Sequence, residues 1–159
     1  MTDTQKKPLW KNELVWLFLL TSGLFAILYS KFILGGYAYV FTDTGADTMQ
    51  INYAQYGLFS SLFRSGESGY VLQAGLGMDV SSYYPAYLIP YNLLILLAPQ
   101  RLLPWAVLAS AYLKMITISL VGYLFYRKLM QDGIGTMAAA LAWTFSGYVI
   151  LWGQHYGFC

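Results

Sequence analysis

Four of the seven acidic residues fall within one stretch of the chain, residues 35–101: Asp43, Asp47, Glu67 and Asp79. A carboxylate can act as a general base on a hydroxyl group, and two carboxylates can hold a divalent metal ion between them. The same stretch contains nine of the fifteen tyrosines, whose rings suit either an aromatic belt at a membrane surface or stacking on a sugar. The search for a functional site therefore begins with residues 35–101.

Asp79 lies in a setting that suits a polar ligand. It follows Gly75 and Gly77, which allow the backbone to approach a bound molecule closely. The polar and aromatic residues that follow it are Ser81, Ser82, Tyr83 and Tyr84. This run can hydrogen-bond to a sugar and stack on it, but an aspartate here is also a common turn or capping residue.

Asp47 has a structural interpretation beside the chemical one. Gln50 follows three residues later, which is the spacing of a capping box, so Asp47 can cap a helix over residues 48–63. The apolar residues at helical spacing in this segment are Ile51, Leu58, Phe59 and Leu62. The run of serines and glycines at 65–69 is expected to end the helix. The positive end of that helix would lower the basicity of the carboxylate.

Three basic residues and one histidine are candidates for binding a lipid phosphate. Arg64 and Arg101 suit this role at the outer interface, although arginines there also anchor in lipid headgroups. Lys114 lies twelve residues beyond Leu102, about 18 Å along a helix and near the bilayer centre. Exposure to lipid there would cost roughly 3 kcal/mol, so we expect its ammonium to face protein, as a counter-charge or in a structural ion pair. His155 suits a proton shuttle or phosphate donor, or is simply solvated.

The composition indicates that these residues are positioned by membrane helices. Hydrophobic residues make up 58% of the chain and charged residues 10%, whereas soluble domains average about 25% charged. So few charges, with a net charge of +2, also exclude a disordered arm or a nucleic-acid partner. The single cysteine, Cys159, has no intrachain partner, so there is no disulfide framework.

Long apolar runs predict an all-α polytopic membrane protein with three transmembrane helices, at 14–34, 102–126 and 136–153; Lys31 and Lys114 are the charges within them. The remaining segments are a cytoplasmic tail at 1–13, an extracytoplasmic loop at 35–101, a cytoplasmic turn at 127–135 and an extracytoplasmic end at 154–159. The small alanines and Gly147 of the third run suit close helix packing.

The orientation follows from the basic residues that flank the runs: Lys6, Lys7, Lys11, Arg127 and Lys128. Basic residues favour the cytoplasmic side, which places the N-terminus in the cytoplasm. The apolar segment 83–99 is broken by Pro85 and Pro90. If it crossed the membrane fully, Arg127 and Lys128 would lie outside, so we expect this segment to be re-entrant or interfacial.

Four segments together resemble the bacterial YfhO family: GADTMQINYAQY at 45–56, GLGMDVSSYYPAYLIPYNLL at 75–94, a Leu-Lys pair at 113–114 and FSGYVILWGQH at 145–155. Each motif is weak alone, but all four occur in the same order and at the same topological places over residues 14–155. The family is similar to the GT-C glycosyltransferases, which transfer a sugar from a polyprenyl-phosphate carrier to an acceptor on the outer face of a membrane.

The resemblance implies a GT-C-like N-terminal part, with interfacial helices in a long first outer loop that faces a cavity at the membrane surface. An acidic residue near the end of the first helix is expected there, and Asp47 occupies that position. Asp47 is therefore the main catalytic candidate, Asp79 a second site residue and candidate metal ligand, and Asp43 the reserve. Members of the family have more spans, so this chain is expected to be a fragment that is inactive alone, located in a bacterial cell membrane. The implied partners are a polyprenyl-phosphate-linked sugar and a cell-envelope glycopolymer acceptor, with a divalent metal as a candidate cofactor.

Two other functions remain open: half of a lipid or solute transporter, in which Lys114 and segment 83–99 line a path, and a noncatalytic membrane scaffold. A transporter spreads polar groups through its spans, whereas an enzyme of this kind gathers them at the outer surface. Four acids lie in one outer stretch and only Lys114 lies deep, which favours the enzyme.

Overall fold

The computed structural model describes residues 12–39, 53–66, 69–72, 77–79, 89–130 and 132–152, and these are mostly helical. The longer elements, in chain order, are α1 (Glu13–Leu28), α3 (Ala54–Ser65), α6 (Leu103–Leu129) and α7 (Gly133–Thr144). The shorter ones are α2 (Ser30–Leu34), β1 (Tyr70–Val71), β2 (Met78–Asp79), α5 (Leu93–Leu97), the 3₁₀ helix η4 (Gln100–Leu102) and α8 (Gly147–Trp152).

Two of the helical stretches, Gln100–Leu129 and Gly133–Leu151, are long and apolar enough to cross a membrane, by length and composition alone. The first predicted span is apolar too, but Tyr29 interrupts it, so α1 is shorter and α2 continues the run. A mostly helical chain with spanning-length helices is thus shown, whereas the count of three membrane crossings stays a prediction.

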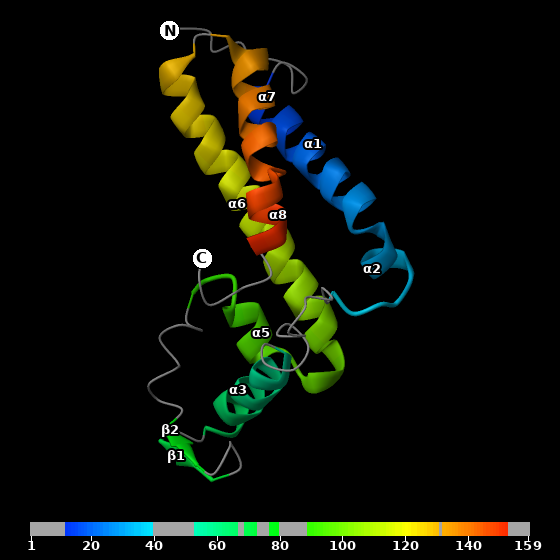
Figure 1. The fold of residues 1–159 in the computed structure, drawn as a ribbon, viewed down its shortest axis with the longest axis vertical. Coiled ribbons are helices and arrows are strands. Elements are labelled where there is room, and N and C mark those ends of the chain that lie inside the picture. Colours follow the sequence, from blue (N-terminus) through cyan, green and yellow to red (C-terminus); the bar gives the residue numbers. More distant parts are fainter. Residues whose placement is uncertain are drawn as a thin grey trace, which may run out of the picture.

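Helices α1, α6 and α7 pack against one another in an up-down-up bundle (Figure 1). The start of α1 and the end of α6 lie at the same end, where Glu13 pairs with Arg127 at 3.4 Å. At the opposite end, the segment after α2 meets the first turns of α6, and α3, α5 and the β1–β2 hairpin are gathered there (Figure 1). Residues 35–101 thus begin and end at one end of the bundle, as a re-entrant or interfacial segment requires.

Polar and small residues hold the bundle helices together. A buried hydrogen bond of 2.9 Å joins Thr21 of α1 to Ser119 of α6. Nearby, Ser22 and Tyr112 form a second one of 2.7 Å. Gly122 of α6 faces the fully buried Ala140 of α7, which confirms the expected close packing at this alanine.

An aromatic cluster joins the bundle to the elements at the end opposite Glu13. The rings of Phe25 and Tyr29 stack at 4.3 Å, and Tyr29 meets Tyr39 edge-on at 5.2 Å. Tyr56 of α3 and Ile95 of α5 are buried in the same cluster. Tyr29 therefore belongs to a buried cluster that includes residues of α1, α3 and α5.

Some helices begin or end at residues other than those predicted for the spans, because capping interactions fix their boundaries. Helix α7 begins three residues before the predicted position 136, because the Asp132 carboxylate accepts from the backbone N–H groups of Ile134 and Gly135. Helix α6 continues to Leu129, past the predicted position 126, since the basic residues of its last turn favour the negative helix end. The predicted third span is broken after Thr144 and resumes as α8.

The predicted helix at 48–63 corresponds to α3, whose described part begins at Ala54. Gly66 ends it in the left-handed conformation, with φ of 71°, which confirms the predicted stop. The proposed Asp47 cap lies outside the described residues. In segment 83–99, the described residues 89–99 contain only the five-residue helix α5, which is too short to span a bilayer.

Candidate phosphate-binding site

The candidate site lies where the last turn of α3 faces the turn between α5 and η4. Helix α3 is fixed against α5 because the buried Ser60 hydroxyl donates a hydrogen bond of 2.6 Å to the carbonyl of Ala98. Beside this bond, Phe59 and Leu62 of α3 pack with Leu96 of α5 in a buried apolar cluster. These contacts set the position of the α3 C-terminus relative to η4.

An open cavity of about 560 Å³ lies between these two segments. The residues that line it are Ser61, Arg64, Ser65, Pro99, Gln100 and Arg101. Arg64 and Arg101, which are far apart in the sequence, thus share one cavity, and both are exposed. The structure therefore brings together two of the predicted phosphate-binding residues.

The cavity has the electrostatics of an anion site. Its lining carries two guanidinium groups, the Ser61 hydroxyl and the Gln100 amide, and no acidic side chain lies among the described lining residues. Gln100 and Arg101 also lie where η4 runs into the start of α6, the positive end of that long helix. Arginine can donate two parallel hydrogen bonds to one phosphate group, so this donor set suits a phosphate as ligand.

The C-terminal end of α3 opposes this field in part, because the last carbonyls of a helix carry partial negative charge. Arg64 lies in that last turn and offsets the charge. The Ser65 hydroxyl donates to the carbonyl of Leu62 at 3.1 Å, so it satisfies a helix-end acceptor rather than a ligand. The donors that face the cavity therefore come from Ser61, Gln100 and the two arginines.

Asp79 lies on the exposed β1–β2 hairpin, where it pairs with Tyr70 in an antiparallel register. Gly77 precedes the second strand with φ of 102°, a backbone conformation in which a residue with a side chain would be strained. The buried Val71 attaches the hairpin to the cluster between α3 and α5. Asp79 therefore belongs to the same end of the molecule as the arginine cavity but does not line it.

The other predicted site residues lie outside the described part of the chain: Asp43, Asp47, Tyr83, Tyr84 and His155. The meeting of Asp47 with Asp79 and a shared metal ion therefore stay predictions. Among the residues that the structure describes, no group of three or more His, Cys, Asp or Glu side chains is placed to hold a metal ion.

Lys114 lies near the middle of α6 and is half-buried. It lines a cavity of about 10 Å³ together with Tyr29, Tyr39, Met115 and other residues. Its side chain therefore faces the interior of the protein and is separate from the arginine cavity. A space of this size holds about one water molecule, which is too little for a solute path.

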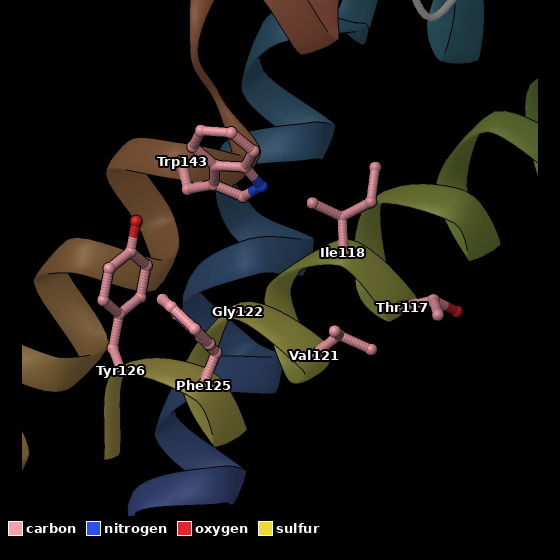
Figure 2. A pocket seen from close by; sticks show the side chains of 7 residues that line it. All are labelled: Thr117, Ile118, Val121, Gly122, Phe125, Tyr126 and Trp143. Carbon is pink, nitrogen blue, oxygen red and sulfur yellow. The ribbon is translucent and has the colours of Figure 1, made fainter. Parts of the chain in front are cut away.

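A larger cavity between α6 and α7 has the opposite character. It also has a volume of about 560 Å³, and its lining residues are Thr117, Ile118, Val121, Gly122, Phe125, Tyr126 and Trp143 (Figure 2). The Thr117 hydroxyl donates to the carbonyl of Leu113, so its donor is used within the helix. The walls are almost entirely hydrocarbon and aromatic rings, which cannot hold an anion.

Tyr53 shows how the start of α3 is tied to the aromatic cluster. It packs against the buried residues there, and its hydroxyl is buried with no hydrogen-bond partner among the described residues. Burial raises the pKa of Tyr53 to about 12. The phenol therefore keeps its proton at neutral pH and does not act as a base.

Ser61 and Gln100, which line the cavity beside the two arginines, were not predicted from the sequence. Ser61 and Arg64 are three residues apart on a helix, so they share a face, and this spacing is a signal that identifies Ser61. Gln100 adjoins Arg101 directly. Sequence analysis also missed Glu13, which contacts both Tyr123 and Arg127 at the other end of the bundle. No comparable spacing links Glu13 to them, because the contact depends on helix packing.

Comparisons of the chain with protein-family models, with curated proteins and with solved structures find no match. The resemblance to the YfhO family therefore rests on the four sequence segments alone, and the arginine cavity is the structural observation on which a function can be built.

Proposed function

We propose that this chain is the N-terminal part of a bacterial membrane glycosyltransferase, which moves a sugar from a polyprenyl-phosphate carrier to an extracytoplasmic acceptor such as a cell-wall polymer. The observation that supports the proposal is the shared cavity of Arg64 and Arg101 at the end of the bundle opposite Arg127. With the N-terminus in the cytoplasm, this cavity lies at the outer surface, where the phosphate of a lipid carrier resides.

In the proposed reaction, the arginine cavity holds the carrier phosphate. Negative charge grows on this phosphate as its bond to the sugar breaks, and fixed guanidinium groups stabilise that charge. The acceptor hydroxyl must lose its proton as the new bond forms, and a carboxylate acts as the general base. Asp47 is the first candidate for this base, with Asp43 in reserve and Asp79 as a second site residue.

The alternative functions gain less support from the described residues. In the transporter hypothesis Lys114 lines the path, but the cavity at Lys114 measures only about 10 Å³. A scaffold needs no cluster of phosphate donors. Two arginines around one open cavity at the surface are what a protein that binds a lipid phosphate requires.

Binding of a lipid phosphate is the direct test. The purified full chain, in octaethylene glycol monododecyl ether micelles, is titrated with farnesyl phosphate and with farnesol, which has the same chain without the phosphate. Charge-assisted hydrogen bonds contribute about 1.5–3 kcal/mol each, so farnesyl phosphate should bind at least about tenfold more tightly. Arg64→Gln and Arg101→Gln should each remove most of this difference.

Lys128→Gln is the matched control, because it removes an exposed positive charge in the last turn of α6, at the other end of the bundle. It should leave the preference for farnesyl phosphate unchanged. Equal binding of farnesyl phosphate and farnesol by the parent chain would refute the phosphate site. An equal loss in the Lys128 variant would show that the preference reflects overall charge and would refute it as well.

A further inference from the structure

A second small cavity lies at the same end of the bundle, between the segment that follows α2 and the first turns of α6. Its volume is about 180 Å³, and its lining residues are Phe32, Gly36, Tyr37, Ala38, Tyr39, Pro104, Trp105 and Leu108. We call it the aromatic cup. Four aromatic rings line this one cavity, whereas the aromatic residues of a membrane belt face the interface singly.

The local backbone holds the rings of the cup in place. Gly36 has φ of 66°, a left-handed conformation that lets the chain turn after α2. A Cβ at Gly35 would lie 2.5 Å from the Lys31 carbonyl oxygen and 2.8 Å from the Tyr37 ring, so glycine fits between the end of α2 and this ring without a clash. Phe32 and Tyr39 meet edge-on at 5.2 Å with an angle of 83° between their planes. The cup therefore has walls in two directions before any ligand arrives.

The cup combines aromatic faces with available polar groups. Tyr37 is 69% exposed and Trp105 is 49% exposed, so both rings are open to a ligand. Within the described part of the chain, the N–H and C=O groups of Gly36, Tyr37 and Ala38 form no backbone–backbone hydrogen bonds. The indole N–H of Trp105 and the hydroxyl of Tyr37 add further hydrogen-bonding groups.

We propose that the aromatic cup binds one pyranose ring. A sugar ring has C–H faces that pack on aromatic rings and hydroxyl groups at its edge that both donate and accept hydrogen bonds. The cavity volume of about 180 Å³ is of the size of one sugar ring. A quaternary ammonium group also fits aromatic rings, but it has no N–H or O–H for the polar groups of the cup.

The position of the cup relates it to the arginine cavity. Arg101 and Trp105 are four residues apart, where η4 runs into α6, so both cavities have a wall at the start of α6. The assignment of the ring to a lipid-linked donor or to an acceptor polymer rests on the proposed function. The binding of a pyranose in the cup does not.

The test uses the purified full chain in octaethylene glycol monododecyl ether, a detergent without sugar, phosphate or choline. Saturation-transfer NMR titrations measure the binding of methyl glucoside, methyl galactoside and methyl N-acetylglucosaminide. Trp105→Leu and Tyr37→Leu should each weaken the best of these by about fivefold or more, as expected for the loss of a stacked ring. Trp105→Phe, which keeps a ring, should retain most of the binding.

Trp143→Leu is the matched control, since Trp143 is 53% exposed and lies on α7 away from the cup. It should bind the methyl glycosides as the parent does. The cup is refuted if no methyl glycoside binds the parent, or if the Trp105 and Tyr37 variants bind as well as the parent. An equal loss in the Trp143 variant, or displacement of the sugar by a lower concentration of tetramethylammonium, also refutes it.

A parallel titration with inorganic phosphate measures binding in the arginine cavity, so the two sites can be tested separately. Arg101→Gln should weaken the binding of phosphate and leave the binding of methyl glycosides unchanged. Trp105→Leu should weaken the binding of methyl glycosides and leave that of phosphate unchanged. Methyl glycoside binding without phosphate binding would support the cup and refute the proposed carrier site. Glucose 1-phosphate then distinguishes a donor sugar from an acceptor sugar in the cup. If it binds more tightly than methyl glucoside and Arg101→Gln removes this advantage, the cup is the donor-sugar site. If the two bind equally, the cup is an acceptor site.

Discussion

Replacing Glu13 separates two interactions that join α1 to α6 at the end of the bundle opposite the arginine cavity. The Tyr123 hydroxyl donates a hydrogen bond of 2.5 Å to the Glu13 carboxylate, and the Arg127 guanidinium lies 3.4 Å from the same oxygen atom. The two partners are four residues apart on α6 and share one face of it. The question is how much each of these two interactions of Glu13 contributes to the free energy of unfolding.

The exposed fractions decide the expected magnitudes. The side chains of Arg127 and Glu13 are 43% and 37% exposed, and solvent screens a pair of this kind to about 0–1 kcal/mol. Tyr123 is only 7% exposed, and a hydrogen bond to a charged group contributes about 1.5–3 kcal/mol when protected from water. Partial exposure of Glu13 reduces that range, so we expect a coupling of about 1–2 kcal/mol with Tyr123 and about 0.5 kcal/mol with Arg127.

Double-mutant cycles measure the two couplings separately. Glu13→Ala is combined with Tyr123→Phe in one cycle and with Arg127→Gln in the other, and unfolding is followed in mixed micelles with increasing dodecyl sulfate. The cycles cancel the separate benefit that Glu13 gains from the positive start of α1. A larger coupling with Arg127 than with Tyr123 would show that the ion pair dominates and would refute the reasoning from exposure.

Three further predictions concern orientation, the interior lysine and the proposed base. Ser61→Cys, in a background without Cys159, should react with an impermeant thiol reagent in intact cells; reaction only after lysis would reverse the orientation. Lys114→Leu should impair folding or activity of the complete protein, because the ammonium faces an interior cavity; unchanged expression, thermal stability and activity would contradict this. Asp47→Asn should preserve stability, since asparagine also caps helices, while sugar transfer falls by about 10²-fold or more; transfer at the parental rate would make Asp47 structural.

Much of the fold follows from the length of the apolar runs in the sequence. The run at 102–126 predicted α6 closely, since a long apolar segment with basic residues after it has few other structures available. The breaks inside the runs were not predictable in this way. Tyr29 and Phe145 interrupt apolar stretches that contain no proline at those positions. Absence of charge shows that a segment tolerates an apolar environment, but it does not show that its helix is continuous.

The candidate site was predicted in its residue types and not in its geometry. Arginines near the expected outer interface pointed to Arg64 and Arg101 as phosphate ligands, but their sequence separation gave no reason to place them in one cavity. That placement depends on the hydrogen bond from Ser60 to the carbonyl of Ala98. A serine in a helix carries no signal for such a partner, because its hydroxyl can equally bond within its own helix.

Helix α6 contacts α1, α5, α7 and η4, and these contacts explain why stability and binding can be measured apart. Its start adjoins both the arginine cavity and the aromatic cup, its middle bonds to α1 through Ser119, and its last turn pairs with Glu13. Axially, α6 rises about 1.5 Å per residue, so its 27 residues separate the two ends by roughly 40 Å. The elements that carry the arginine cavity are fixed locally, by Ser60 and the apolar cluster between α3 and α5. Loss of the Glu13 contacts should therefore lower the free energy of unfolding without changing phosphate affinity. Arg101→Gln should instead weaken phosphate binding and leave the free energy of unfolding unchanged.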